Sequence, residues 1–343
     1  MSILQDSYFS IVYLFKATNK KIFQKWLKIF RNFAVIVLME ILEINGNKLY
    51  KFNVGASSYL MDPFHGARLI NWNIMMADGT IRDVIYWPEN ERISGAGLPT
   101  VLGGMFIMFP FCGNSFIDGK AGFWKTPYDE KIRAIPQHGF ALAGDFEEVF
   151  CSDTDIRLRY IPSEEAKEGY PFKYEFEVFY KFNELSFSCE LILHNDDSVK
   201  IPWGAGVHPF FTIPWSSNTT RKDYRIIHDA KKGYYIQKDG SFVSADISKN
   251  CFDDAEMVNR LHGSLKTGVI TFGNKSGEED ITIKINGGGT PEAGTTLVTW
   301  TKSEQEPYYC VEPWMSMPNS ASNPIHYVAP NATKSFSVDI CLY

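Results

Sequence analysis

Two short segments of the sequence hold side chains that could exchange protons. His208 lies in the segment IPWGAGVHPFF, directly before a proline, and Glu312 lies directly before a proline in the segment VEPW. A proline disfavours the helical conformation of the residue before it, so both side chains are expected on extended backbone. An imidazole and a carboxylate held in this way beside aromatic rings could form an acid/base pair facing a sugar-sized ligand. The alternative interpretation is a pair of ordinary X-Pro turns.

Aromatic residues are frequent near both segments. Aromatic rings pack well against the apolar C–H faces of sugars, so some of these residues could line a binding cleft. The alternative interpretation is that most of them belong to an apolar core and that one or two at most line a cleft. The residues concerned are Trp203, Phe210, Phe211, Trp215 and Trp314.

Two further residues are candidates for ligand contacts. His138, in the segment IPQHGFA, precedes Gly139, and a glycine allows the backbone to approach a ligand or another strand closely. For a single histidine of this kind, a role in the core or in a turn is the alternative. Asn114 follows an apolar run, GGMFIMFPFC, and could offer its amide to a ligand hydroxyl or be an ordinary turn asparagine.

The elements that must position these residues are predicted to be strands. From Glu40 onward, short alternating runs are broken by Gly, Asn, Asp and Pro. The Asn45–Gly46 turn predicts a hairpin, and strict alternation on both sides of Asn183 predicts a second one. No run keeps a long helical period, and no phosphate-binding glycine pattern occurs. The prediction is all-β, a single large antiparallel β-sandwich. Other strands are expected at residues 56–61, 67–74, 281–285, 296–300, 308–311 and 335–342.

Composition narrows the class of protein. The 343 residues are 22% charged and 45% hydrophobic, as in a folded globular protein. The net charge of −6, with no long basic block in the body of the chain, argues against nucleic-acid binding. The six cysteines show no CxxC spacing, which favours free thiols over a zinc site or disulfides. We expect a reduced, cytoplasmic protein without a metal or other cofactor, either a monomer or a homodimer.

The first 38 residues differ from the remainder. They are basic, and apolar residues recur in them at helical spacing, as in an amphipathic helix that could lie on an anionic membrane surface. Membrane contact is expected only if this segment is native. The favoured interpretation is that residues 1–38 are not native and that Met39 is the true start. If the segment is native, it is expected to be disordered or helical. Residues 39–343 are predicted to form one β-supersandwich domain.

Four segments occur in the order in which they occur in a known family. LGGMFIMFPFCGN, HGFA, GVHPFF and VEPW resemble motifs of the aldose 1-epimerase (galactose mutarotase-like) family, and the resemblance runs from about Glu40 to the C-terminus. It implies a β-supersandwich whose concave face binds a sugar. By position, His208 matches the general acid and Glu312 the general base. The resemblance also implies sugar contacts from His138 and Asn114, and Trp314, an aromatic residue beside Glu312, is predicted as a further contact.

The sequence departs from the family's pattern at two positions. Family members often have arginine where this chain has Ser115, and many have arginine where it has Leu142. The missing basic residues favour an unphosphorylated sugar, although Lys120, Lys125 or Arg133 could substitute. The family's additional substrate-binding aspartate is expected before Arg260. The candidates for it are Asp246, Asp253 and Asp254.

The function expected from this resemblance is interconversion of the α and β anomers of a free aldose. A carboxylate can take the proton of the anomeric hydroxyl, and a histidine can give and regain a proton near neutral pH. Three alternatives remain: a hexose-6-phosphate mutarotase, a non-catalytic carbohydrate-binding protein, and a glycoside-cleaving enzyme. The last commonly needs two carboxylates, and only Glu312 lies in a motif.

Overall fold

The computed structural model describes residues 37–343, apart from residues 90, 92, 96, 217 and 278–279. These residues form one compact unit. Expectations for residues 1–36, including the amphipathic helix, lie outside the described residues. The first strand, β1, begins at Val37, so Met39 lies within a strand and not ahead of it. Within the described part of the chain, no helix has the length and apolar character needed to cross a membrane.

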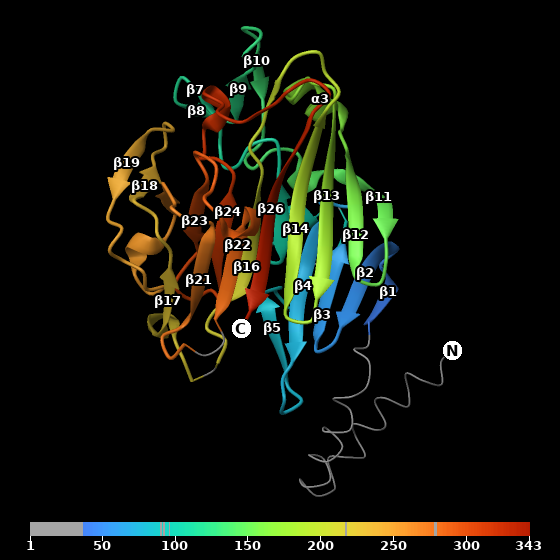
Figure 1. Cartoon of the computed structure of the whole chain (residues 1–343), viewed down its shortest axis with the longest axis vertical. Coiled ribbons are helices and arrows are strands. Elements are labelled where there is room, and N and C mark those ends of the chain that lie inside the picture. The colour runs from blue at the N-terminus through green and yellow to red at the C-terminus, as the bar shows by residue number, and fades with distance from the viewer. Residues whose placement is uncertain (1–36, 90, 92, 96, 217, 278–279) are drawn as a thin grey trace, which may run out of the picture. The chain divides into compact units, whose positions relative to one another are not determined.

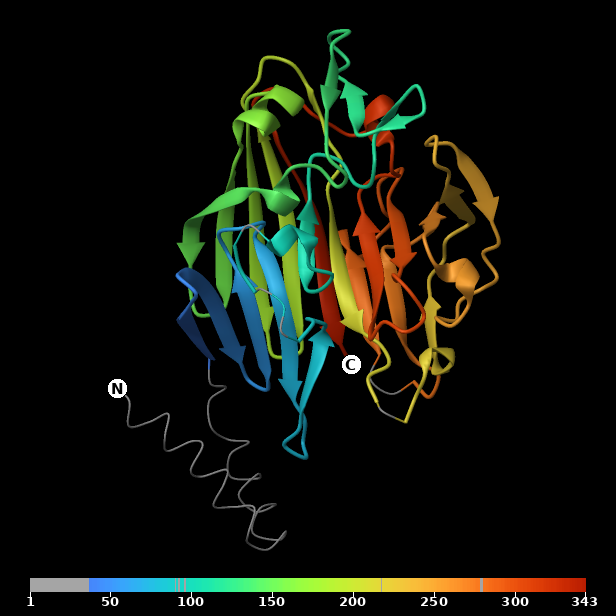
Figure 2. The same ribbon diagram turned by 180° about the vertical axis from the view of Figure 1, so that it is seen from behind.

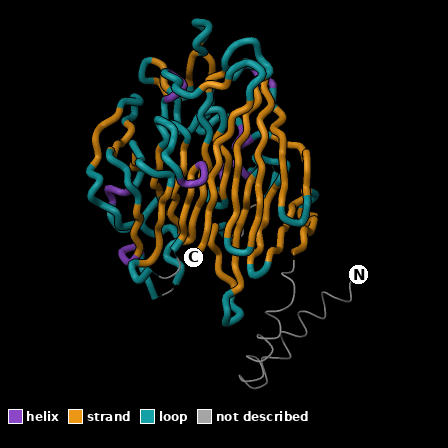
Figure 3. The backbone as a smooth tube through the Cα atoms, in the orientation of Figure 1, coloured by secondary structure: helices purple, strands orange, loops and turns teal. Residues whose placement is uncertain are grey.

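Two large antiparallel sheets make up most of this unit, as Figure 3 shows by the predominance of strand. The larger sheet has 12 strands among the described residues. Its order is β1 (Val37–Ile44), β2 (Asn47–Val54), β3 (Ser57–Asp62), β4 (Arg68–Met75), β5 (Ile81–Ile85), β16 (Gly206–Thr212), β24 (Tyr308–Trp314), β23 (Thr296–Trp300), β20 (Arg260–Gly263), β18 (Lys232–Ile236) and β19 (Phe242–Ala245). The twelfth strand, β6 (Met105–Met108), pairs with both β16 and β4.

The smaller sheet has eight strands and faces the viewer in Figure 1, whereas Figure 2 shows the larger sheet in front. Its order is β11 (Asp145–Cys151), β12 (Asp155–Ile161), β13 (Tyr174–Asn183), β14 (Ser186–Asn195), β26 (Thr333–Leu342), β22 (Ile281–Ile285), β21 (Val269–Asn274) and β17 (Tyr224–Ile227). Three short two-stranded pairs complete the described strands: β7 (Phe116–Ile117) with β8 (Lys120–Ala121), β9 (Phe123–Lys125) with β10 (Ile132–Ala134), and β15 (Ile201–Pro202) with β25 (Tyr327–Val328).

Helical structure is sparse in the described residues. One α-helix, α3 (Glu164–Gly169), begins after Ser163, whose side chain accepts a hydrogen bond from the Ala166 N–H. The predicted all-β, antiparallel fold is confirmed. The remaining helical turns are 3₁₀ turns at Leu98–Thr100, Ala141–Ala143, Arg221–Asp223, Ala255–Met257, Asn286–Gly288 and Ser320–Ser322.

Both predicted hairpins are present. Asn45 and Gly46 connect β1 to β2 with φ angles of 53° and 79°, the left-handed values that a two-residue hairpin turn requires. In β13 and β14, buried and half-buried or exposed side chains alternate, because one face of the smaller sheet packs on the core. The strands β22 and β23 have the predicted bounds. β24 runs three residues beyond its predicted end, through a proline, and so includes Glu312.

The main apolar core lies between the two sheets. Alternate residues of a strand face opposite sides, so β16 sends Val207 and Phe211 into this core. The ring centroids of Phe211 and Phe272, which lies on β21 of the smaller sheet, are 4.8 Å apart. The other face of β16 carries His208 and Phe210. That second face of the larger sheet holds a separate, smaller apolar cluster and the candidate site.

Gly139 marks a close backbone approach. Its φ is 77°, and a Cβ atom at this position would lie 2.0 Å from the carbonyl oxygen of Phe109. The neighbouring Phe140 N–H donates to the same oxygen at 2.8 Å. The contact joins the loop that carries His138 to the chain that leaves β6. The sequence-based expectation that a glycine here permits close approach to another segment is therefore confirmed.

Replacing Gly139 by alanine should destabilise the protein far more than the same change in an open turn. Gly46 is the matched control, because its φ is 79° but no atom lies within 4 Å of its would-be Cβ. Gly46→Ala should lower the free energy of unfolding by about 1 kcal/mol, the penalty of the left-handed backbone alone. Gly139→Ala adds a backbone clash and should lower it by about 3 kcal/mol or more. Urea denaturation measures both, and equal losses would contradict the close approach.

Candidate active site

Neighbouring strands of the larger sheet bring a row of side chains together. The register of β16 with β24 places His208 opposite Glu312. Phe106 of β6 pairs with His208, and Val298 of β23 pairs with Glu312. The row therefore crosses four strands, β6, β16, β24 and β23, on the face turned away from the inter-sheet core. Segments about a hundred residues apart in the chain meet here.

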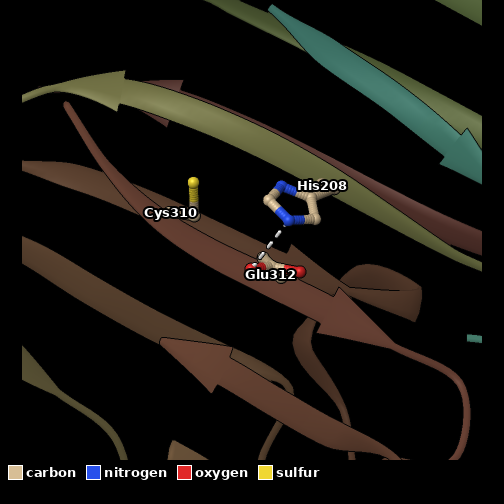
Figure 4. A group of neighbouring side chains, drawn as sticks. All are labelled: His208, Cys310 and Glu312. Carbon is tan, nitrogen blue, oxygen red and sulfur yellow. Dashed lines mark ion pairs between the residues drawn. The ribbon is translucent and has the colours of Figure 1, made fainter. Parts of the chain in front are cut away.

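His208 and Glu312 are in direct contact. His208 Nε2 lies 3.2 Å from Glu312 Oε1, and Figure 4 shows the two side chains pointing toward each other from adjacent strands. His208 is 7% exposed and Glu312 is 1% exposed. Both line a cavity of about 420 Å³, which is large enough for a monosaccharide. The structure thus brings together the two residues on which the predicted acid/base pair depends.

Burial governs the protonation of this pair. Burial lowers the pKa of the His208 imidazole well below its usual 6.5, and the neighbouring His138 acts in the same direction. Burial also raises the pKa of the Glu312 carboxyl well above its usual 4.5. Both shifts disfavour charge, so we infer that the pair holds one proton, on Glu312, which donates to His208 Nε2.

Trp314 fixes the second oxygen of Glu312. Its indole Nε1–H donates to Glu312 Oε2 at 3.1 Å, within the buried site. A donor to the ionised carboxylate favours that form, so this hydrogen bond opposes the effect of burial on the pKa of Glu312. Trp314 lines the cavity, as predicted for a sugar contact, and it also orients the carboxyl group.

His138 lies at the same end of the cavity as Trp314. The ring centroids of these two residues are 5.7 Å apart, and those of His138 and His208 are also 5.7 Å apart. The Gly113 N–H donates to His138 Nδ1 at 3.2 Å, so the neutral imidazole carries its proton on Nε2. Burial lowers the pKa of His138 to about 4. At neutral pH, His138 is therefore an uncharged hydrogen-bond donor in the wall of the cavity.

Aromatic rings pack around His208 on its other sides. The Phe106 ring centroid lies 4.4 Å from that of His208, and the Phe210 centroid lies 4.8 Å away with its plane 20° from parallel. Trp300 of β23 approaches edge-on at 5.8 Å. These rings remove the imidazole from water and limit its orientation. They are the physical cause of its lowered pKa.

One wall of the cavity is a loop fixed by a buried arginine. Arg68 is fully buried and donates to the carbonyl oxygens of Leu98, Val101 and Gly103 at 2.5–2.6 Å. Its guanidinium carbon also lies 5.5 Å from the Phe106 ring centroid. The loop presents apolar side chains, including Leu102, to the cavity. Because three carbonyl groups of the loop accept hydrogen bonds from one guanidinium, the loop is held in a single conformation beside the cavity.

Asn114, predicted as a sugar contact, does not line the cavity. Its backbone carbonyl accepts a hydrogen bond from the Asn319 N–H at 2.8 Å, which makes it part of a loop-to-loop connection. The basic residues considered as phosphate ligands are also elsewhere. Lys125 pairs with Glu130, Arg133 pairs with Asp129, and Lys120 does not line the cavity.

The candidate aspartates do not reach the cavity either. Asp246 accepts from the N–H and hydroxyl of a nearby serine, and Asp254 caps a 3₁₀ turn. Asp253 lines a different surface depression. The residue before Arg260 that does line the cavity is Asn259, whose φ is 58°. Sequence reasoning sought a carboxylate in this stretch and so passed over the asparagine.

Several lining residues were missed by sequence reasoning. Trp300 pairs with Cys310 of β24, in the row next to Glu312, so it belongs to the same sheet face. The signal for it was the predicted strand 296–300, but the register that brings this strand beside Glu312 was unknown. Of the aromatic candidates, Phe210 and Trp314 line the cavity, Trp203 and Phe211 lie in the inter-sheet core, and the half-buried Trp215 packs against that core. The other lining residues missed are Pro99, Val101, Leu102, Phe106, Gln137, Asn259 and Val298.

Cys310 adds a third donor atom beside the pair. Its sulfur, a nitrogen of His208 and an oxygen of Glu312 all lie within 4.8 Å of one another, and all three residues are buried (Figure 4). These residue types could bind a transition-metal ion, a possibility that the cysteine spacing did not indicate. Burial raises the pKa of the Cys310 thiol well above 9, whereas a metal ligand must be a thiolate. Neutral thiol is therefore the favoured state.

The chain belongs to the aldose 1-epimerase family. Residues 63–239, about half of the chain, match the family's sequence profile, described as aldose 1-epimerase. His138 and His208 lie within the matched range. Glu312 lies beyond it, so its place in the site rests on the geometry above. A search of curated proteins found no match.

Solved structures share the fold over nearly their whole lengths. A galactose mutarotase-like protein from Clostridium acetobutylicum gives a TM-score of 0.69 at 15% identity, covering 90% of this chain and 98% of that one. A galactose mutarotase related enzyme from Lactobacillus acidophilus gives 0.66 at 16%, covering 89% and 97%. The Slr1438 protein from Synechocystis sp. PCC 6803 gives 0.66 at 20%, covering 91% and 98%. At these identities the likeness establishes the galactose mutarotase-like fold.

Replacing Trp314 by phenylalanine should raise the pKa of Glu312. The change keeps the ring but removes the indole N–H that stabilises the carboxylate, so the carboxyl group should keep its proton to higher pH. Infrared difference spectroscopy measures the pH at which the carboxylic C=O band assigned through Glu312→Gln disappears. The control is Trp215→Phe, at a half-buried position against the inter-sheet core, which should leave this band unchanged. A lower or unchanged pKa in Trp314→Phe would exclude the assigned hydrogen bond.

Proposed function

We propose that this protein interconverts the α and β anomers of a free aldose by acid/base-assisted opening and closing of the sugar ring. The observation that carries the proposal is the 3.2 Å contact of His208 with Glu312 in a cavity of about 420 Å³. Membership of the aldose 1-epimerase family supports the reaction class. The sequence-based assignment of an acid and a base to these two residues is retained.

The reaction adds one proton to the sugar and removes another from it. Opening the hemiacetal requires a proton on the ring oxygen and loss of the proton of the anomeric hydroxyl. Closing on the other face of the aldehyde reverses both transfers, which gives the other anomer. A site that holds one proton between an acid and a base can serve both directions and is restored after each turnover.

The contact between the two side chains provides a route for that proton. In the free site, burial favours the proton on Glu312. When sugar hydroxyls stabilise the charged form, the proton can pass across the contact to His208 Nε2. His208 then protonates the ring oxygen, and the Glu312 carboxylate accepts the anomeric proton. Trp314 holds the carboxylate through its other oxygen, and His138 Nε2–H can donate to a sugar hydroxyl.

The lining of the cavity weighs against two alternatives. None of the described lining residues is a lysine or arginine, which supports a free sugar over a sugar phosphate. Glu312 is the only carboxylic acid among those lining residues, whereas glycoside hydrolysis commonly uses two carboxyl groups flanking the bond. A sugar-binding protein without catalysis would share the cavity but not the rate effect of its acid/base pair.

Removing either member of the pair should abolish most of the rate enhancement. Polarimetry on freshly dissolved α-D-glucose and α-D-galactose, in a buffer that catalyses mutarotation poorly, measures the decay of rotation above the spontaneous rate. His208→Asn and Glu312→Gln should each reduce kcat/KM by about 10²-fold or more, the usual contribution of a general acid or base. Asp246→Asn is the matched control, because Asp246 lies outside the cavity and should not affect the rate.

The same experiment separates the proposal from its rivals. If the wild-type protein binds a sugar without accelerating its mutarotation, the protein is a carbohydrate-binding module and the catalytic proposal is wrong. Glucose 6-phosphate is added to the assay as a third substrate; if it alone is accelerated, the free-aldose assignment is wrong. If either active-site variant keeps the full rate, that residue is not the acid or the base.

A further inference from the structure

The cavity has a polar end and an apolar end, with the acid/base pair between them. Trp314 pairs with Gly206 of β16, and His138 packs against Trp314 at this end. Phe210 lies four residues further along β16, and it shares a cross-strand row with Trp300. The donors of His138 and Trp314 are therefore on one side of His208, and on the other side lie the rings of Phe210 and Trp300, whose one polar group is the Trp300 indole N–H.

The lining as a whole is predominantly apolar. Nine of the fourteen described lining residues have apolar side chains. Among these, Leu102, Leu142 and Trp300 pack against the smaller apolar cluster of the larger sheet but are only half-buried. They therefore leave apolar surface at the cavity. Leu102 belongs to the loop that Arg68 holds in place, so this wall cannot readily rearrange to offer backbone polar groups.

A polar residue also stands beyond the apolar end, but at a distance. Asn259 precedes β20, which is separated from β16 by β24 and β23. Three strand spacings of about 4.8 Å place its backbone about 14 Å from that of His208. Its side chain is exposed. The backbone of Asn259 is thus well separated from the position beside His208.

Covalent structure decides which part of an aldose meets the apolar end. The ring oxygen is bonded to C5, and in an aldohexose C5 carries the only carbon substituent of the pyranose ring. If His208 protonates the ring oxygen, that substituent lies next to His208, among Phe106, Phe210 and Trp300. A hydroxymethyl group there would place its hydroxyl among aromatic rings whose one hydrogen-bond donor is the Trp300 indole N–H, whereas a methyl group would be buried favourably.

We propose that the protein's substrate class is the 6-deoxyaldohexoses, sugars with a methyl group at C5 in place of a hydroxymethyl or phosphorylated group. This inference rests on the proposed function for the placement of the ring oxygen at His208. Trp300 acts as a specificity-determining residue, because it is the half-buried aromatic side chain facing the methyl position. The hydroxyls at the other ring carbons face the end of the cavity that holds His138.

The test compares sugars that differ only at C6. Acceleration of mutarotation, relative to each sugar's spontaneous rate, is measured for D-glucose with 6-deoxy-D-glucose and for D-galactose with 6-deoxy-D-galactose. The 6-deoxy sugar of each pair should have a kcat/KM higher by about tenfold to a hundredfold, within the range of discrimination that an apolar pocket achieves. Trp300→Gln should reduce this ratio to about threefold or less. Trp215→Gln, a half-buried tryptophan that packs against the inter-sheet core and does not line the cavity, is the matched control and should keep the wild-type ratio.

The outcomes distinguish this inference from the proposed function. Acceleration with both members of each pair, but with the hydroxylated sugar equal or better, overturns the inference and leaves the mutarotase proposal intact. If no sugar is accelerated, the mutarotase proposal fails, and calorimetric titration with the same four sugars decides the inference alone. Tighter binding of the 6-deoxy sugars, lost in Trp300→Gln, then supports it; equal, weaker or absent binding of the 6-deoxy sugars overturns it.

Discussion

Burial of an imidazole against a carboxyl group is the interaction on which the rest of this site depends. Two fully formed charges in such a place would carry a large desolvation penalty, which their mutual attraction would only partly offset. One shared proton avoids that penalty, and it is the form favoured by the opposite pKa shifts of His208 and Glu312. In the free site the proton therefore rests on Glu312, and its transfer to His208 requires groups that stabilise the charged forms.

The fold holds this pair through the two faces of its central strands. In β16, Val207 and Phe211 anchor one face in the inter-sheet core, and His208 and Phe210 are thereby directed to the other. The same alternation in β24 directs Glu312 into the cavity. The position of the His208–Glu312 pair is thus tied to folding of the whole sandwich. Two loops complete the cavity around the pair. Arg68 fixes one of them, and Gly139 joins the other to the chain that leaves β6.

Local sequence predicted the parts of this site that depend on local rules. The X-Pro contexts of His208 and Glu312 correctly indicated extended backbone, and alternation indicated the strands. What could not be predicted is register between strands far apart in the chain, such as β16 and β24. Trp300 was missed for that reason. Asn114 was expected at the cavity because a loop's course is not set by composition, and the structure directs it into a connection between loops.

The pH dependence of kcat/KM for the wild-type protein tests the central claim most directly, because it reports protonation of the free site. With one proton on the pair, activity should fall in acid only when a second proton binds. That step is governed by the lowered pKa of His208, so the acid limb should lie below pH 6.5. Loss of the shared proton should produce the alkaline limb, above the usual pKa of a glutamate. An acid limb at or above pH 6.5 would show a solvated histidine and would contradict this account.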